Sequence, residues 1–365
     1  MKNPFNPSFG KVPVVFLDRS KLSSRIVNEL SDPNSPYQTS LIYGQRGSGK
    51  TSLMTDVAYK LNQDKSWIVI DLALNSNLLD NLVSQLQNKL ITLDIIKSVD
   101  LNFSLGPVSM GVNLEKNQLK FDYQLAIEEA LTYFQKRNYK VLITIDEVKR
   151  SLQLRNLISY YQIMVRKNLP VALIMAGLPE NVSELQNDNV LTFLLRANRI
   201  ILNPLNNYSV RESYQKVFTH DFMHVDNKAI LIMTKWVDGF AYAFQLLGYL
   251  VWEEASKTGE LTNATVLNAK DDFLLNLNRN VYFKVYSDLT MREKEYVKAM
   301  AKMDHNSVKN SELSKALGKP ANYLSVYRRK LIDSQIIKSS EYGYVEFALP
   351  FFKDFVEEQI FFEEE

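Results

Sequence analysis

The residues from Gly44 to Thr51 have the types and the spacing needed to bind phosphate groups. They read Gly-Gln-Arg-Gly-Ser-Gly-Lys-Thr, which fits the pattern glycine, four residues, glycine, lysine, hydroxyl residue without a mismatch. Glycines let the backbone turn so that consecutive N–H groups converge on phosphate oxygens at the start of a helix. Lys50 would add a positive charge at the β- and γ-phosphates, and the Thr51 hydroxyl would hold Mg²⁺. The candidate nucleotide-binding residues are therefore Gly44, Gln45, Arg46, Gly47, Ser48, Gly49, Lys50, Thr51 and Ser52.

The sequence on either side of this loop supports the same interpretation. A short strand-like run covers 39–43, and apolar residues recur at helical spacing between Lys50 and Leu61. The alternative is a chance match in a glycine-containing turn. The order strand, loop, helix is what a phosphate-binding loop requires, so it favours binding of a nucleoside triphosphate.

A second group of candidate residues follows the apolar run 141–145. Asp146 and Glu147 end this predicted strand, and open α/β sheets bind their ligands at the carboxyl ends of parallel strands. We expect Asp146 to hold the Mg²⁺ and Glu147 to polarise the attacking water, a role that phosphoryl transfer to water requires. A kinase or another transferase is disfavoured because no acceptor pocket is recognisable in the sequence.

Composition limits the remaining possibilities. The chain has 365 residues, 46% of them hydrophobic and 23% charged, as in an ordinary soluble protein with two or three domains. Its formal charge is only +2, so any affinity for nucleic acid must come from a local patch. The absence of cysteine excludes disulfides and thiolate chemistry. Residues 1–7 lack the apolar core of a signal peptide and 240–252 is too short to span a bilayer, so we expect a cytoplasmic protein without a membrane partner.

Hydrophobic patterning predicts the fold class α/β, with a parallel sheet followed by an all-α lid and a winged helix. The predicted domains are a nucleotide-binding core at 1–203, with a β insertion at about 99–121, a helical lid at 204–286, and a winged helix with a C-terminal tail at 287–365. The last assignment depends on three helices, opened by a capping box at Thr290 and by Pro320, followed by a predicted hairpin around Tyr342 to Tyr344.

These motifs together resemble the AAA+/STAND-type P-loop ATPases, and most closely the branch with an origin-recognition-like ATPase domain followed by a winged helix. The resemblance covers nearly the whole chain. Besides the loop and Ile145-Asp146-Glu147, it depends on the segments at 3–19, 176–179, 193–199 and 239–248 and on the C-terminal domain. It implies ATP and Mg²⁺ as ligands, ATP hydrolysis, and the ASCE class of P-loop proteins, which carry a catalytic glutamate.

Two departures from the family pattern concern nucleotide sensing. AAA+ proteins usually carry a polar residue, which senses the γ-phosphate, at the position of Ala176-Gly177. In the lid, Tyr242 stands at the position of a sensing arginine and Ala241 at the position of the proline in the STAND pattern. The departures favour slow hydrolysis and a switch over a motor.

The resemblance also gives Arg196 a candidate role as an arginine finger. It lies before the last predicted core strand, the place from which family members project an arginine into a neighbouring subunit to stabilise transition-state charge. This role would require a homo-oligomer. The alternative is a solvated arginine that interacts with a helix C-terminus, and Arg199 is the other candidate finger.

The third helix of the predicted winged helix carries a candidate DNA-binding surface. Residues 284–338 contain 12 Lys and Arg against six Asp and Glu, whereas the tail after Ser340 is acidic. A basic helix of this kind suits the major groove of double-stranded DNA. The candidate contacts are Asn322, Ser325, Arg328, Arg329 and Lys330.

Two functions from different classes remain open at this point. The first is an ATP-binding and hydrolysing switch, alternating between ATP and ADP, whose winged helix binds DNA. The second is a STAND-type signalling or defence ATPase in which the winged helix is an intramolecular lock or contacts another protein.

Overall fold

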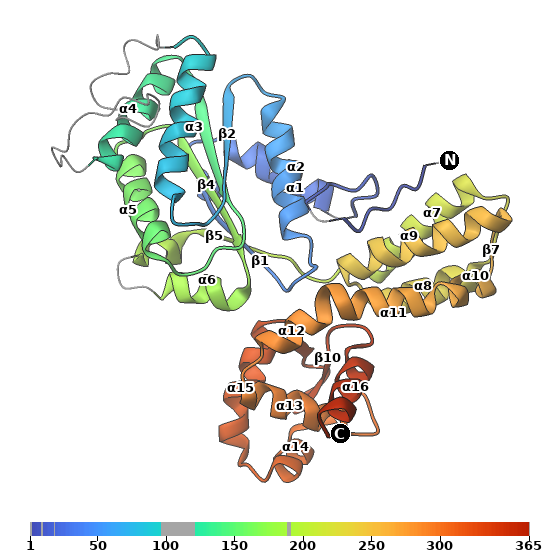
Figure 1. The fold of residues 1–365 in the computed structure, drawn as a ribbon. Coiled ribbons are helices and arrows are strands. Elements are labelled where there is room, and N and C mark those ends of the chain that lie inside the picture. The colour runs from blue at the N-terminus through green and yellow to red at the C-terminus, as the bar shows by residue number, and fades with distance from the viewer. Residues whose placement is uncertain (1, 9, 18, 96–120, 188–190, 365) are drawn as a thin grey trace. The chain divides into compact units, whose positions relative to one another are not determined.

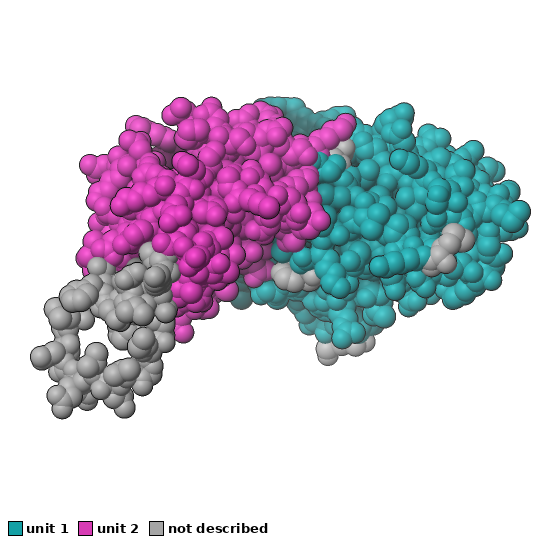
Figure 2. Space-filling model, turned by 90° about the horizontal axis from the view of Figure 1, so that it is seen from above, with its two compact units in different colours: residues 1–20, 44–52, 202–365 teal, residues 21–43, 53–201 magenta. Residues whose placement is uncertain are grey.

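The computed structural model describes residues 2–8, 10–17, 19–95, 121–187 and 191–364. The insertion expected at about 99–121 lies, apart from Phe121, outside these residues. The chain forms two compact units (Figure 2). Unit 1 comprises residues 1–20, 44–52 and 202–365, and unit 2 comprises residues 21–43 and 53–201. The phosphate loop therefore belongs to the same unit as the lid and the C-terminal domain.

A five-stranded parallel sheet forms the centre of unit 2, with the strand order β2-β3-β4-β1-β5. Its strands are β1 (Thr39–Tyr43), β2 (Trp67–Leu72), β3 (Lys140–Ile145), β4 (Val171–Gly177) and β5 (Asn198–Ile201). The helices along this part of the chain are α1 (Arg19–Leu30), α2 (Lys50–Asn62), α3 (Leu78–Thr92), α4 (Tyr123–Lys136), α5 (Leu152–Arg166) and α6 (Pro179–Gln186), with 3₁₀ helices at Pro36–Gln38 and Thr192–Arg196. The predicted fold class is confirmed.

The strands are buried on both faces, which explains why they read as continuous apolar runs in the sequence. Helices α3, α4 and α5 lie on one side of the sheet and α1 and α2 on the other (Figure 1). In β3, Val141, Ile143 and Ile145 pack with the first group of helices, whereas Leu142 is buried on the opposite face. Because successive side chains point to opposite faces of the sheet, each strand contributes to one apolar layer on either face.

Unit 1 is mainly helical and continues through the lid into the C-terminal domain. Its lid contains α7 (Asn207–Asp221), α8 (Asn227–Val237), α9 (Ala241–Thr258), α10 (Asn263–Asn268), α11 (Lys270–Leu277), a π-helical turn at Asn278–Tyr282 and α12 (Phe283–Asp288), with short strands β6 (His224–Val225) and β7 (Glu260–Leu261). One hydrophobic cluster runs from Phe5 through the lid to Ile360, so lid and C-terminal domain share a core.

The C-terminal domain has the predicted order of three helices and a hairpin. It consists of α13 (Met291–Ala301), β8 (Val308–Lys309), α14 (Asn310–Leu317), α15 (Ala321–Asp333), β9 (Ile337–Lys338), β10 (Tyr344–Phe347) and α16 (Phe352–Glu364), and its sheet has the order β8-β10-β9. Thr290 forms the predicted capping box with Glu293, and Gly318 ends α14 in the left-handed conformation. Strand β8 and helix α16 were not predicted.

The N-terminal segment is attached to the lid by one aromatic side chain. Phe5 is buried against Tyr214, Phe218 and Phe244, and a Cβ atom at Gly248 would lie 2.6 Å from its ring. The Asn6 N–H donates to the side chain of Gln245 at 2.9 Å, which fixes the direction of the chain beyond Phe5. Only glycine at position 248 leaves room for this packing.

No helix among the described residues is long and apolar enough to cross a membrane.

Candidate functional site

The phosphate loop connects the end of β1 at Tyr43 to the start of α2 at Lys50, as the sequence predicts. Gly47 and Gly49 have φ angles of 76° and 90°, a region that side-chain-bearing residues rarely adopt. Gly44 is needed for a different reason, because a Cβ atom there would lie 2.8 Å from Ser48 Oγ. The glycines therefore allow a turn that delivers the loop backbone to the first turn of α2.

The charged and polar groups of the loop are held close to its own backbone. Lys50 Nζ donates to the carbonyl oxygens of Gly44 at 2.8 Å and Gln45 at 2.9 Å. The first N–H groups of an α-helix have no acceptor within the helix and leave partial positive charge at its N-terminus. Together with the lysine, the start of α2 is suited to an anionic ligand.

One buried hydroxyl in the loop supports the same conclusion. Ser48 is 5% exposed, and among the described residues its Oγ atom has no hydrogen-bond partner. Leaving a buried hydroxyl unpaired costs about 1–3 kcal/mol. A phosphate oxygen bound in the loop would accept this hydrogen bond, so the loop fits an oxyanion ligand.

Arg19 supports the loop from the N-terminal segment, a role that the sequence did not reveal. Its guanidinium is buried, and Nη2 donates to the carbonyl oxygens of Ser48 at 3.3 Å and Asn203 at 2.8 Å. Asn203 lies at the predicted hinge into the lid. A buried charge that bonds two carbonyls ties the loop to this hinge.

The lid contacts the loop at Gly47. The Tyr242 N–H, at the start of α9, donates to the Gly47 carbonyl oxygen at 3.0 Å. A Cβ atom at Gly47 would lie 2.7 Å from the ring of Phe240 and 2.9 Å from Tyr242 Cβ. The two lid residues thus lie directly against the loop backbone, and both fall in the segment where the sequence departs from its family pattern.

The C-terminal domain and the end of the lid helix α12 also contact the loop, at two neighbouring loop residues. The Gln45 N–H donates to Gln335 Oε1 at 3.1 Å, and Arg46 Nη2 pairs with Asp288 Oδ2 at 3.2 Å. Gln335 has a φ of 58° and follows the end of α15. Neither Gln335 nor Asp288 carries a local motif, so sequence reasoning had no signal by which to find them.

In unit 2, Asp146 and Glu147 form a turn directly after β3. The Glu147 N–H donates to Asp146 Oδ1 at 2.8 Å, and Glu147 has a φ of 50°. A left-handed conformation costs a residue with a side chain about 1–2 kcal/mol. The Val148 N–H donates to the Ala176 carbonyl oxygen at 2.8 Å, which holds the strained turn against β4. Glu147 is exposed and Asp146 is partly exposed, so both carboxylates face accessible space.

A side chain at Gly177, next to this turn, would be crowded by Val148. A Cβ atom at position 177 would lie 2.9 Å from Val148 Cγ2 and 3.1 Å from the Val148 carbonyl oxygen. Val148 is fully buried and follows Glu147 directly. Val148, which anchors the acidic turn, therefore occupies the space that the Cβ atom of any side chain at position 177 would need.

The two candidate finger arginines are both exposed in unit 2. Arg196 ends the 3₁₀ helix Thr192–Arg196, and Arg199 lies in β5, an edge strand of the sheet. The chain is already extended at Asn198, the first residue of β5. Backbone pairing of β5 with β1 competes successfully with local helix propensity here.

The candidate DNA-contacting residues lie on α15 and differ in exposure. Asn322, Ser325, Arg329 and Lys330 are exposed, and the Arg329 side chain is 86% exposed. Arg328 is half-buried instead, and its Nη2 atom donates to Ser339 Oγ at 3.1 Å. Arg328 therefore connects α15 to the hairpin, whereas the other four side chains remain accessible.

Two protein families match parts of this chain. The family described as "ATPase domain predominantly from Archaea" matches residues 16–169, and a domain of unknown function (DUF8462) matches residues 279–356. No curated protein sequence matches. The first match covers the phosphate loop and the acidic turn and supports ATPase activity in general.

Solved structures are similar to this chain over most of its length, and the first of those described next, with a TM-score of 0.62, shows the same fold. The Walker-type ATPase PABY2304 of Pyrococcus abyssi is 16% identical, with a TM-score of 0.62, covering 93% of this chain and 96% of its own. The Orc1 protein of Aeropyrum pernix, solved in complex with DNA, is 15% identical with a TM-score of 0.46, and the match covers 97% of this chain and 95% of the Orc1 chain. Cdc6p of Pyrobaculum aerophilum is 11% identical with a TM-score of 0.47, covering 97% of both chains.

The packing of Gly177 against Val148 leads to a prediction on stability. Gly177→Ala should lower the free energy of unfolding by about 1–3 kcal/mol, because the added methyl group overlaps Val148. Urea denaturation of this variant, of Val148→Ala and of the double variant measures the coupling between the two positions. Because Val148→Ala removes Cγ2, the double variant should lose less free energy of unfolding than the two single variants lose together. Effects that add within about 0.5 kcal/mol would show that the two side chains do not compete for space.

Proposed function

We propose that this protein is an ATP-binding and hydrolysing molecular switch whose C-terminal domain is a winged helix that binds DNA in a nucleotide-dependent way. The single observation that carries the ATP-binding part is the loop between β1 and α2, with its positive-φ glycines, its lysine and the unpaired buried hydroxyl of Ser48. The family match over residues 16–169 supports it.

The proposed ligands are distributed over the loop and the acidic turn. The loop N–H groups and Lys50 bind the phosphates, and Lys50 leaves its two carbonyl partners to do so. The Thr51 hydroxyl and the Asp146 carboxylate would hold Mg²⁺, which would neutralise negative charge on the phosphates. Strands β1 and β3 both pair in parallel with β4, so their carboxyl ends lie at one edge of the sheet. This topology supports a shared role for the segments that follow them.

Glu147 is the proposed water-positioning base, and Arg196 the proposed finger. The strained backbone of Glu147 fixes the direction in which its carboxylate leaves the strand, as residues at catalytic sites often require. Arg196 is exposed and can therefore reach a second copy of the chain in a homo-oligomer. Turnover per molecule that does not change with protein concentration would remove Arg196 from this role.

A slow switch fits the surroundings of the site better than a motor. Gly177 places no sensing side chain beside the acidic turn, and Tyr242 replaces the arginine that other lids present to the phosphates. Hydrolysis then depends on Glu147 without these additional charges. The protein would remain in its ATP form for long periods.

Two variants test ATP binding and hydrolysis separately. Lys50→Ala should abolish ATP binding measured by calorimetry, because the loop loses its side-chain charge. Glu147→Gln should bind ATP with unchanged affinity yet hydrolyse it at least about 100-fold more slowly, since the amide cannot accept the water proton. ATP binding by Lys50→Ala at the parent's affinity would refute the site, and normal turnover of Glu147→Gln would exclude the carboxylate from the mechanism.

The DNA-binding part of the proposal depends on the exposed side of α15. Asn322, Ser325, Arg329 and Lys330 share access to solvent, and the hairpin beside them carries the fully exposed Tyr342. Helix α15 has 13 residues, and the domain has an excess of basic residues around it. An exposed basic helix with an adjacent hairpin fits a major groove and the flanking phosphates.

Salt dependence tests this surface. If Arg329 contacts a phosphate, Arg329→Ala should reduce the slope of log K against log salt concentration by about one unit, as one fewer counterion is released. Fluorescence anisotropy with labelled duplexes, with and without ATP, measures it. Arg279→Ala is the matched control, since Arg279 is an exposed arginine of the lid. The absence of duplex binding at low salt in both nucleotide states would refute DNA binding.

A second candidate function is favoured by the contacts of the loop with the C-terminal domain and with the end of α12. In this alternative, a STAND-type signalling or defence ATPase uses the C-terminal domain as an intramolecular lock. Gln335 accepts a backbone hydrogen bond of Gln45, and Asp288 pairs with Arg46. Both contacts would have to adjust if nucleotide binding changed the loop conformation.

The lock makes a prediction that the DNA-binding switch does not require. Gln335→Asn tolerates the left-handed backbone but is one methylene shorter, and Asp288→Asn removes the charge that pairs with Arg46. Each variant should bind ATP up to about tenfold more tightly, because a contact that opposes rearrangement of the loop is weakened. Gln359→Asn, in α16, is the control. Unchanged ATP affinity in both variants would exclude the lock.

A further inference from the structure

The lid and the C-terminal domain are joined by one nearly continuous helical segment, 270–288. It comprises α11, the π-helical turn Asn278–Tyr282 and α12. The Phe283 N–H bonds the Asn278 carbonyl oxygen, five residues earlier, which defines the wider turn. Single π-helical turns inside α-helices occur frequently at functional sites. The wider turn therefore indicates that segment 270–288 does more than link the lid to the C-terminal domain.

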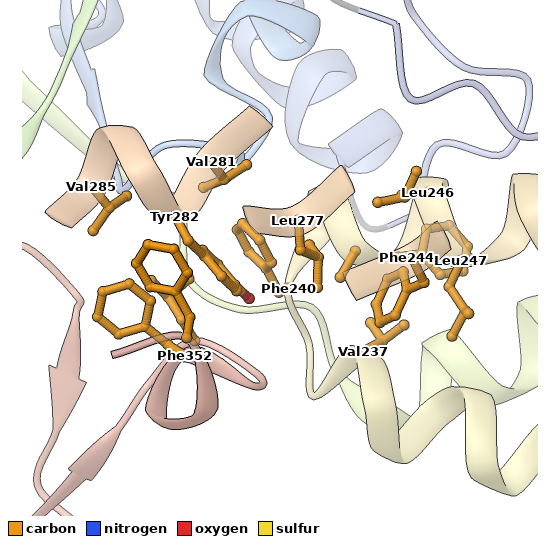
Figure 3. Packing of buried hydrophobic residues seen from close by; sticks show 14 of the residues in the cluster. Val237, Phe240, Phe244, Leu246, Leu247, Leu277, Val281, Tyr282, Val285 and Phe352 are labelled. Carbon is orange, nitrogen blue, oxygen red and sulfur yellow. The ribbon is translucent and has the colours of Figure 1, made fainter. Parts of the chain in front are cut away.

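Side chains of this segment are buried on both sides of the π-helical turn. Leu277 lies among the lid residues Val237 and Phe240, whereas Tyr282 points toward Phe352 of the C-terminal domain (Figure 3). The rings of Tyr282 and Phe352 are 5.2 Å apart and edge to face, and the Tyr282 hydroxyl donates to the Pro350 carbonyl oxygen. A rotation of the turn would move packed groups in both parts of the unit.

The exposed side of the same turn reaches the phosphate loop through one lid residue. Asn280 Nδ2 donates to the Tyr242 hydroxyl oxygen at 2.8 Å. The backbone N–H of Tyr242 donates to the Gly47 carbonyl oxygen, and its Cβ atom lies against Gly47. Tyr242 is thus bonded at its backbone to the loop and at its hydroxyl to the π-helical turn.

The chemistry of the Tyr242 hydroxyl suits a stable connection. Burial raises the pKa of this group, an effect that the hydrogen bond from Asn280 only partly opposes. The hydroxyl therefore stays neutral and can accept the Asn280 amide proton throughout the physiological pH range. Phe240, with its ring centroid 6.3 Å from that of Tyr242, holds the tyrosine from the other side.

We propose that Tyr242 is a positioning residue that couples the conformation of the phosphate loop at Gly47 to the π-helical turn through Asn280, and thereby to the C-terminal domain. The inference depends on the proposed binding of ATP at the loop. A change at Gly47 on nucleotide binding moves the start of α9, the Tyr242 hydroxyl follows, and the turn at Asn280 rotates or unwinds. The Tyr242 hydroxyl would thus transmit the change at Gly47 to Asn280, whereas an arginine at position 242 would contact the nucleotide itself.

Two conservative variants separate this coupling from simple packing. Tyr242→Phe keeps the ring, its contact with Phe240 and the backbone bond to Gly47, but loses the acceptor for Asn280. Asn280→Ala removes the donor from an exposed position. Asn278→Ala is the matched control, because Asn278 belongs to the same turn and makes no side-chain hydrogen bond to Tyr242.

The experiment is hydrogen–deuterium exchange of the full chain with and without ATP, in a Glu147→Gln background that limits hydrolysis. In the parent, ATP should change the exchange of backbone amides in 278–288. Tyr242→Phe and Asn280→Ala should lose this change while their ATP affinity, measured by calorimetry, stays within about tenfold of the parent. Asn278→Ala should keep it.

The outcomes distinguish this inference from the proposed function. An ATP-induced change in 278–288 that persists in Tyr242→Phe and Asn280→Ala would overturn the coupling while leaving ATP binding intact. ATP binding to the parent with no change in that segment would also overturn it. Failure of the parent to bind ATP would refute the proposed function itself, and the coupling with it.

Discussion

The close approach of the lid to Gly47 is the contact that joins the phosphate loop to the start of α9. The loop can receive Phe240 and Tyr242 only because position 47 has no side chain and adopts a positive φ. The same backbone that is shaped for phosphate oxygens therefore offers its Gly47 carbonyl to the first turn of α9. The Gly47 carbonyl thus accepts a hydrogen bond from the N-terminus of α9, while the positive φ of the same residue shapes the loop backbone.

At the acidic turn of unit 2, close packing likewise requires a glycine, at position 177. Glu147 adopts a costly left-handed backbone, and the turn is held by Val148, which bonds β4 and packs against Gly177. A polar side chain at position 177 would compete with that anchor for space. The glycine at position 177 and the strained backbone of Glu147 thus belong to the same packing around Val148.

The continuous core of unit 1 explains how separate sequence segments act as one body. Phe5 anchors the N-terminal segment in the lid, and the helical segment 270–288 carries the lid core into the C-terminal domain. Because packed interiors deform little, a change at one end of such a core is passed on as a displacement of whole elements. The contacts of Gln335, Asp288 and Tyr242 with the loop all belong to this one unit.

The phosphate loop, the parallel sheet, the acidic turn and the order of helices at the C-terminus could be predicted from the sequence, because each depends on local rules. Glycine spacing, apolar runs that end in acids, and capping residues such as Thr290 act within a few residues of the chain. The distant residues that meet the loop could not be predicted in this way, because tertiary packing brings them together. Arg19, Tyr242, Asp288 and Gln335 are separated from it by tens to hundreds of residues, and the π-helical turn has no composition signal. Such contacts arise from the packing of complete elements, which rules acting within a few residues do not describe.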